Sequence, residues 1–275
     1  DLDDPFWYPA TKQAYRTAKI LNFDITVFAP KGRGEAGTLE MVHFLKKVLE
    51  ERYDGICISP IADLRVEKLL QKMAEKGVEV IFILSAFDSV PYRTLIGTDS
   101  YQCGRSTGEA VREALGADGA VGIIKWKDNL IETVEDRYHG VVDVLKENRI
   151  PYYDMTGPGE PTAEEATKLT DRLLTEHPDI SVLCATNVGW GLAFARYLKS
   201  KGKKVKLVTV DFTDEVGEFM KAGYVDAAIA QRPESWGSMT LEKIEAVFEG
   251  QSIPKTIDTG TYPVTPANIR IYVKD

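Results

Sequence analysis

The chain has 275 residues, of which 44% are hydrophobic and 28% are charged, a composition typical of a folded globular protein with a substantial core. Its formal net charge of −8 disfavours nucleic acid as a partner, because affinity for the phosphate backbone depends on clustered cations. No apolar run approaches the roughly 18 residues that a membrane-spanning helix needs, and no signal peptide is recognisable.

The first residues predict the start of a helix. Asp4 suits the N-cap and Pro5 suits the first helical position. A doubly wound lobe has a strand ahead of its first helix, and only three residues precede Asp4. We therefore expect the first strand of this lobe to be missing from the chain or to be supplied in an unusual way.

Short apolar runs then alternate with segments of helical periodicity. The runs, rich in Val, Ile and Phe, predict buried parallel strands, and the segments between them predict amphipathic helices. The expected strands cover residues 24–28, 55–59, 79–84, 95–99, 121–125, 181–185 and 205–210, and the expected helices cover residues 39–51, 66–76, 100–115, 134–147, 163–176 and 192–200. Such alternation predicts an α/β protein whose parallel sheets are covered by helices on both faces.

The alternation restarts in the middle of the chain. The short strand at 95–99 is followed at once by a helix, and a second strand–helix series begins at Ala120. We therefore predict two lobes, with the chain crossing from one to the other near residues 98–100.

Polar side chains follow several expected strands at their carboxyl ends, the edge where ligands bind in parallel sheets. Amide, carboxylate and guanidinium groups together offer the donors and acceptors that vicinal hydroxyls of a sugar require. Two aromatic residues at the first helix offer flat faces for the C–H side of a pyranose or cyclitol ring. The candidate ligand-binding residues are Asp4, Phe6, Trp7, Ser85, Arg137, Asn187, Asp211 and Gln231.

Each candidate also has a structural role open to it. Asp4 suits an N-cap alone, and the aromatic pair suits the core at a helix start. Asn187 and Asp211, taken singly, suit turns or caps, and Arg137 suits a surface ion pair with an adjacent acidic residue. Their expected convergence at the loop ends of one fold favours a binding site.

The sequence does not match the motifs of common enzyme classes. The segment KGRGEAG lacks both the Walker Lys-Ser/Thr and a GxGxxG frame, and no GxSxG nucleophile elbow occurs. The three cysteines and three histidines share no metal-ligand spacing. Asp211 has no identifiable acid–base partner. We predict a protein that is not an enzyme and that uses no metal and no cofactor.

A family resemblance rests on segments that occur in a fixed order. These are DDPFW, YDGICISP, KGVEVIFI, IGTDSYQCGRSTGEAV, DRYHG, LLTEHPDISVLCATN, VTVDFTDE, VDAAIAQRPESWG and IRIYVKD. The sequence resembles the type I periplasmic sugar-binding proteins, close in layout to ribose-binding proteins and to the effector core of lactose-repressor-type regulators. The resemblance covers the chain except the first strand. It implies two Rossmann-like lobes joined by a three-strand hinge, one from residues 1–98 plus about 233–258 and one from 99–232 plus about 259–275.

The resemblance also implies roles for the candidate residues. Asp4, Phe6 and Trp7 would contact the ligand from the first lobe. Arg137, Asn187 and Asp211 would contact it from the second, with Gln231 at the hinge. Ribose-type relatives often carry an Asp-Arg pair after the fourth strand, where this chain has Leu84-Ser85 and then Asp88, so an aldopentose is not assigned. Asp88, Trp126 and Trp190 are further candidates, and Trp190 could equally pack on its own helix.

The favoured function is a receptor that closes about its hinge on a small polyhydroxy solute, a sugar or a cyclic polyol such as an inositol. It would be the monomeric, extracytoplasmic or periplasmic solute-binding component of an ABC importer, read by a permease or a sensor partner. Two alternatives remain open, the effector domain of a lactose-repressor-type regulator and the ligand-sensing domain of a membrane receptor.

Overall fold

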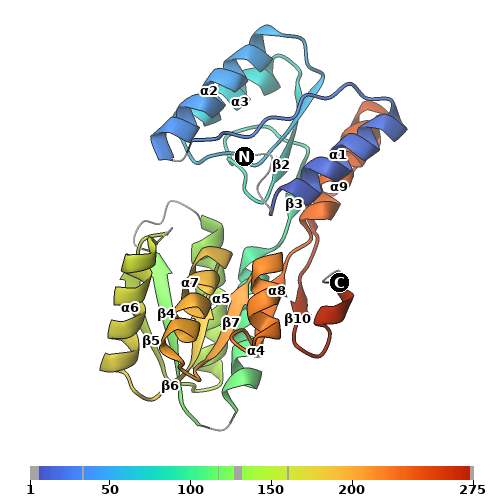
Figure 1. Ribbon diagram of the computed structural model, residues 1–275. Coiled ribbons are helices and arrows are strands. Elements are labelled where there is room, and N and C mark those ends of the chain that lie inside the picture. The colour runs from blue at the N-terminus through green and yellow to red at the C-terminus, as the bar shows by residue number, and fades with distance from the viewer. Residues whose placement is uncertain (1–5, 33, 117, 127–131, 160, 273–275) are drawn as a thin grey trace. The chain divides into compact units, whose positions relative to one another are not determined.

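The computed structural model describes residues 6–32, 34–116, 118–126, 132–159 and 161–272. The chain divides into two compact units (Figure 1). Unit 1 combines the chain up to Thr98 with Arg232–Thr259, and unit 2 combines Asp99–Gln231 with the chain from Gly260 onward. The backbone therefore crosses between the units three times, after Thr98, after Gln231 and after Thr259.

Unit 1 is a parallel sheet with helices on both faces. Its elements are α1 (Tyr8–Leu21), α2 (Gly34–Glu50), β1 (Gly55–Ile58), α3 (Leu64–Glu75), β2 (Glu79–Ile83), β3 (Thr94–Gly97), α9 (Pro233–Phe248) and β9 (Thr256–Asp258), with strand order β1-β2-β3-β9. Successive residues of a strand point to opposite faces, so Val80 and Phe82 pack against α2 and α3 while Ile81 packs against α1 and α9.

The strand expected at residues 24–28 is wrong. This segment is extended, but no described strand pairs with it, and β1 is the edge of the four-stranded sheet. Ile25 and Val27 are nevertheless half-buried, and the exposed Phe28 ring stacks on Phe44 at 4.2 Å. Apolar alternation predicts which side chains are half-buried, but a strand also needs backbone partners from a neighbour.

Unit 2 is a larger sheet covered in the same way. Its elements are α4 (Ser100–Leu115), β4 (Ala120–Trp126), α5 (Glu132–Glu147), β5 (Tyr152–Gly157), α6 (Ala163–Glu176), β6 (Ile180–Ala185), α7 (Val188–Lys201), β7 (Lys206–Val210), α8 (Asp214–Lys221), β8 (Ala227–Ala230), β10 (Tyr262–Val264) and a 3₁₀ turn (Ile269–Ile271). The strand order is β10-β8-β7-β6-β4-β5, parallel except for β10. The predicted α/β class with two parallel sheets is confirmed. Strand β5 was not predicted, because an edge strand reading YYDMTG carries little apolar signal.

Helices α4 and α5 cover one face of this sheet, and α6, α7 and α8 cover the other. Glycines let the α4 and α5 backbones touch: a Cβ on Gly104 would lie 2.1 Å from the carbonyl oxygen of Arg137, and one on Gly140 would lie 2.3 Å from that of Tyr101. This contact fixes the position of α5, and with it the backbone of Arg137.

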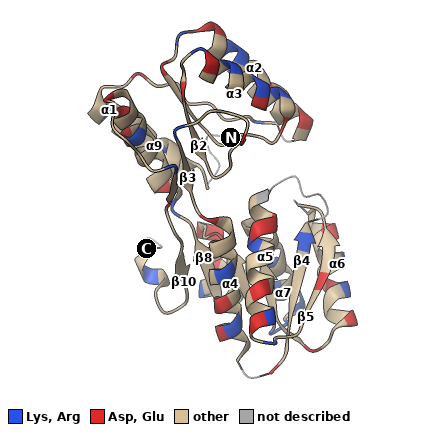
Figure 2. Cartoon of the chain, turned by 180° about the vertical axis from the view of Figure 1, so that it is seen from behind, with Lys and Arg blue, Asp and Glu red and all other residues tan. Residues whose placement is uncertain are grey.

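Acidic and basic residues are mixed along α2, α3, α4 and α5 (Figure 2). Opposite charges interspersed in this way suit a solvated surface rather than a nucleic-acid interface. Within the described part of the chain, no helix combines the length and apolar character needed to cross a bilayer.

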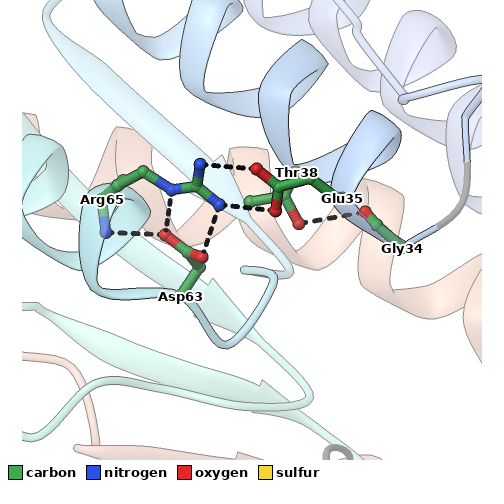
Figure 3. Close-up of polar contacts among 5 residues, drawn as sticks. All are labelled: Gly34, Glu35, Thr38, Asp63 and Arg65. Atoms are coloured by element: carbon green, nitrogen blue, oxygen red, sulfur yellow. Dashed lines mark hydrogen bonds and ion pairs between the residues drawn. The ribbon is translucent and has the colours of Figure 1, made fainter.

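Arg65 joins the first turns of α2 and α3 in unit 1 (Figure 3). Its guanidinium donates to both carboxylate oxygens of Glu35 at 2.8 Å and to both of Asp63 at 2.9 Å. Asp63 also caps α3 by accepting from the Arg65 backbone at 2.7 Å. Hydrogen bonds from Arg65 lower the pKa of the Asp63 carboxyl to about 2 and also lower the pKa of Glu35.

Candidate functional site

In unit 2, polar residues follow three adjacent strands. Asn187 follows β6 by two residues, Asp211 comes directly after β7, and Gln231 comes directly after β8. Neighbouring parallel strands place their carboxyl ends at one edge of the sheet, so the three residues share that edge. All three are buried, with 9%, 6% and 3% of their surface exposed. Buried polar side chains at a strand edge require partners.

Asp211 and Gln231 are directly linked. The Gln231 side-chain amide donates to Asp211 Oδ1 across 2.6 Å, and the Asp211 backbone N–H donates to Ile229 O. The other amide atom, Gln231 Oε1, is buried and has no hydrogen-bond partner among the described residues. Asp211 adopts a left-handed backbone, with φ of 70°. The pair therefore presents one carboxylate and one unsatisfied acceptor at the sheet edge.

Arg137 supplies a buried cation to unit 2. Only 5% of its surface is exposed, and its Nη1 donates to the carbonyl oxygen of Thr186 at 3.3 Å. Its Nε is buried without a partner in the described structure. Thr186 directly precedes Asn187, so the guanidinium of α5 lies at the end of β6. The surface ion pair with a neighbouring acidic residue, considered from sequence, does not form among the described residues, because the guanidinium is buried at the sheet edge.

Asn187 caps α7. Its Oδ1 accepts from the backbone N–H of Trp190 at 3.1 Å, so the cap role weighed from sequence is present. The cap uses the side-chain oxygen, and the side-chain nitrogen is the group left for a ligand. A single amide can thus hold the helix start and still donate a hydrogen bond.

The two tryptophans of unit 2 differ. Trp126 ends β4, is half-buried, and packs so closely on Gly159 that a Cβ there would lie 2.8 Å from the indole ring. Its Nε1 is buried and, among the residues described, unpaired. Trp190 is 1% exposed and donates Nε1 to Pro158 O at 2.9 Å. Trp190 is therefore a core residue and not a rim aromatic, because both its ring and its N–H are already satisfied inside the unit.

In unit 1, the aromatic pair precedes α1. The Phe6 and Trp7 rings meet edge to face at 5.4 Å, and each packs on Trp236 at 5.7 Å. Both are half-buried, so they belong partly to the core, as the structural alternative supposed, while keeping exposed surface. Asp4 lies outside the described residues.

The other two candidates of unit 1 lie beyond β2. Ser85 donates its backbone N–H to Ile83 O at 2.8 Å in a tight turn, next to Leu84 with φ of 65°. Asp88 is exposed on the following turn. Within the described structure, neither side chain forms a hydrogen bond with another candidate residue. The charged pair often found here in ribose-type relatives is thus replaced by one small hydroxyl at the strand end.

Sequence comparison decides the family. The periplasmic binding protein domain family matches residues 1–252. The chain belongs to this family. Among curated relatives, it is similar to the ribose import binding protein RbsB of Bacillus subtilis (strain 168), at 20% identity over 93% of this chain and 82% of the relative. The Haemophilus influenzae (Rd) ribose import binding protein is 25% identical over 93% of this chain and 86% of the relative.

Solved periplasmic and ABC-transporter solute-binding proteins share the fold. One from Burkholderia graminis C4D1M, in complex with D-arabinose, matches with a TM-score of 0.86 and 23% identity over 99% of this chain and 95% of that one. Another from Actinobacillus succinogenes 130z, with bound D-allose, matches with a TM-score of 0.86 and 20% identity over 99% and 97%. These likenesses establish the fold of a type I periplasmic binding protein.

One residue with the same placement was missed from the sequence. Ser59 follows β1 directly, as Ser85 follows β2 after one intervening residue, and is half-buried. The end of the run GICIS was available as a signal. The predicted strand at 55–59 included Ser59 as its last residue, whereas β1 ends at Ile58.

Two of the three thiols of this periplasmic binding protein are unsuited to nucleophilic chemistry. Burial raises the pKa of Cys57 and Cys184 to about 12, so both are protonated at neutral pH, whereas the thiolate is the nucleophile. Within the described ranges, no cluster of three His, Cys, Asp or Glu residues could hold a metal ion.

Proposed function

We propose that this periplasmic binding protein is the sugar-binding component of an ABC importer and that it closes about its three crossings on a polyhydroxy ring. The curated relatives are ribose import binding proteins, and three of the similar structures contain bound D-arabinose, alpha-D-tagatopyranose or D-allose. A membrane permease is the proposed partner, and an extracytoplasmic location follows from that role.

The observation that carries the proposal is the set of unsatisfied groups at the sheet edge of unit 2. Arg137 Nε is a buried donor and Gln231 Oε1 is a buried acceptor, neither with a partner among described residues. Each such group costs on the order of 1–3 kcal/mol. A ligand whose adjacent hydroxyls both donate and accept would satisfy both groups and the Asp211 carboxylate.

Residues at the strand ends of unit 1 favour a neutral ligand. Ser59 and Ser85 offer hydroxyls instead of charges, and the Phe6 and Trp7 rings offer apolar faces. A ligand that binds the closed state more tightly than the open state stabilises the closed state by this difference in affinity.

A thermal-shift panel tests the proposal. The probes are D-ribose, D-arabinose, D-allose, D-galactose, D-tagatose and myo-inositol, with L-leucine as a non-sugar control. A ligand at about 100 times its Kd stabilises by about 2.7 kcal/mol, which is roughly 5 °C or more for a protein of this size. If no sugar or polyol raises the melting temperature at millimolar concentration, the proposal is wrong.

A further inference from the structure

Trp236 lies where two features of unit 1 meet. Its side chain is 0% exposed, and it stands in the first turn of α9, shortly after the second crossing of the chain. Its ring packs against both Phe6 and Trp7 at 5.7 Å. One side of this indole therefore sets the position of the aromatic pair.

Trp236 also contacts the residue that precedes the third crossing. Its Nε1 donates to Thr259 Oγ1 at 3.0 Å, and Thr259 is the last residue of unit 1 before that crossing. The Thr259 backbone N–H in turn donates to Gly97 O at 2.8 Å, one residue before the end of unit 1 at the first crossing. A continuous series of contacts thus runs from the aromatic pair through Trp236 to two crossings.

The helix that carries Trp236 is held rigidly against the helix that follows the aromatic pair. A Cβ on Gly237 would lie 1.9 Å from the carbonyl oxygen of Ala10, so the α9 and α1 backbones are in direct contact. The residue after Thr259 is Gly260, with φ of 66°, a conformation in which glycine is unstrained. The series of contacts therefore begins at the closely packed helices α1 and α9. It ends at Thr259, next to a glycine whose backbone conformation is open to few other residues.

We propose that Trp236 is a positioning residue that couples the aromatic pair Phe6–Trp7 to the first and third crossings through Thr259. The proposal rests on the proposed function, because it assigns to Trp236 the transmission of ligand contact to the hinge. A buried indole needs a partner for its N–H, and here that partner is a side chain at a crossing. Movement of Thr259 on closure then displaces Trp236 and the rings that pack on it.

The first test needs no ligand. Thr259→Val keeps the shape of the side chain but removes the acceptor, Trp236→Phe keeps a ring but removes the donor, and the double variant removes both. Hydrogen exchange of the backbone amide at position 259 should become roughly tenfold faster in each single variant. This factor corresponds to the net free energy of about one hydrogen bond. The double variant should be no faster than the singles. Thr240→Val is the matched control, because Thr240 is buried in the same helix and its hydroxyl donates only to carbonyl oxygens of that helix.

The second test uses the sugar that gives the largest thermal shift. Thr259→Val should weaken its binding roughly fivefold to tenfold in calorimetry, while Thr240→Val, although it loses a hydroxyl bond of the same kind, should bind as the parent does. A role in packing alone would lower the melting temperature of both variants and leave affinity unchanged.

The outcomes separate the two proposals. If no sugar binds, the proposed function fails, and the exchange rates alone still decide whether Trp236 orders the crossing. If Thr259 exchanges at the parent rate in both single variants, the coupling is wrong whatever sugar binds. If exchange accelerates but sugar affinity is unchanged, Trp236 orders the crossing without serving the ligand, and the proposed coupling is overturned.

Discussion

The Gln231 side chain donates to Asp211 across 2.6 Å, and the Asp211 backbone is left-handed, with φ of 70°. Asp and Asn enter this conformation more readily than other residues with a side chain. The residue that follows β7 thus suits this position in two ways, by its backbone geometry and by its carboxylate. The bond between the two side chains also orients the unpaired Oε1 of Gln231.

Asp211→Asn separates these two roles. Asn tolerates the left-handed backbone and its Oδ1 can still accept from Gln231, so the free energy of unfolding should change by less than about 1 kcal/mol. Loss of the charge should weaken sugar binding by about 2–3 kcal/mol, measured by calorimetry. Asp171→Asn is the control: Asp171 accepts from Tyr197 at 2.7 Å in the same unit and should leave affinity unchanged. Equal binding by the parent and Asp211→Asn would remove Asp211 from the site.

Arg137→Met should uncouple stability from binding. The buried guanidinium has no carboxylate partner in the described structure, and apolar replacements of buried charges are often neutral or stabilising. We expect the ligand-free protein to be as stable as the parent or about 1 kcal/mol more stable in urea denaturation, with sugar affinity reduced at least 30-fold. Arg196→Met removes an exposed partner of Glu215 and should change neither quantity by more than about 0.5 kcal/mol. A large loss of stability in Arg137→Met would indicate a structural role.

Trp126→Phe tests the unpaired indole N–H at the end of β4. Removing a buried donor that has no partner should cost little stability, whereas a ligand that uses it should bind roughly fivefold to tenfold less tightly. Trp190→Phe should instead lower the free energy of unfolding by about 1 kcal/mol or more, because it loses the hydrogen bond to Pro158 O. Unchanged affinity in Trp126→Phe would assign Trp126 to packing against Gly159.

Acid stability depends on Arg65. The folded-state pKa values of Asp63 and Glu35 are lowered by hydrogen bonds from Arg65, so the two carboxylates contribute stability above their unfolded pKa values of about 4. That contribution is lost as pH falls through the range from about 4 toward 2. Arg65→Gln should therefore lower the melting temperature at pH 6, and the difference from the parent should shrink toward pH 2.5. Arg172→Gln, from an exposed pair with Glu176, is the control. A constant difference across this pH range would contradict the assignment.

The contact between α4 and α5 should be sensitive to one methyl group. Gly104→Ala places a Cβ 2.1 Å from Arg137 O, which forces the helices apart and should cost about 1–3 kcal/mol. Because the displaced backbone is that of Arg137, sugar affinity should also fall. Ser106→Ala, on the exposed side of α4, is the control in urea denaturation and calorimetry. Parent-like stability in Gly104→Ala would mean that the helices can separate without cost.

The alternation of strands and helices and the polar residues at the strand ends could be predicted from the sequence. Local patterns carry both kinds of information: apolar runs such as VLCA and LVTV mark buried strands, and the polar residue that ends each run lies at the loop edge by the geometry of a parallel sheet. Asn187, Asp211 and Gln231 could therefore be named as candidates from their positions alone.

Which buried polar groups find hydrogen-bond partners depends on the tertiary structure. Trp126 and Trp190 are both tryptophans near strand or helix ends, yet one N–H is unpaired and the other is bonded to Pro158, 32 residues away in the chain. Arg137 reaches a carbonyl 49 residues away, and Trp236 joins the aromatic pair to Thr259. The strand predicted at residues 24–28 was wrong for the same reason. Hydrogen bonds and packing between distant segments depend on sheet order and helix contact, which no local pattern contains.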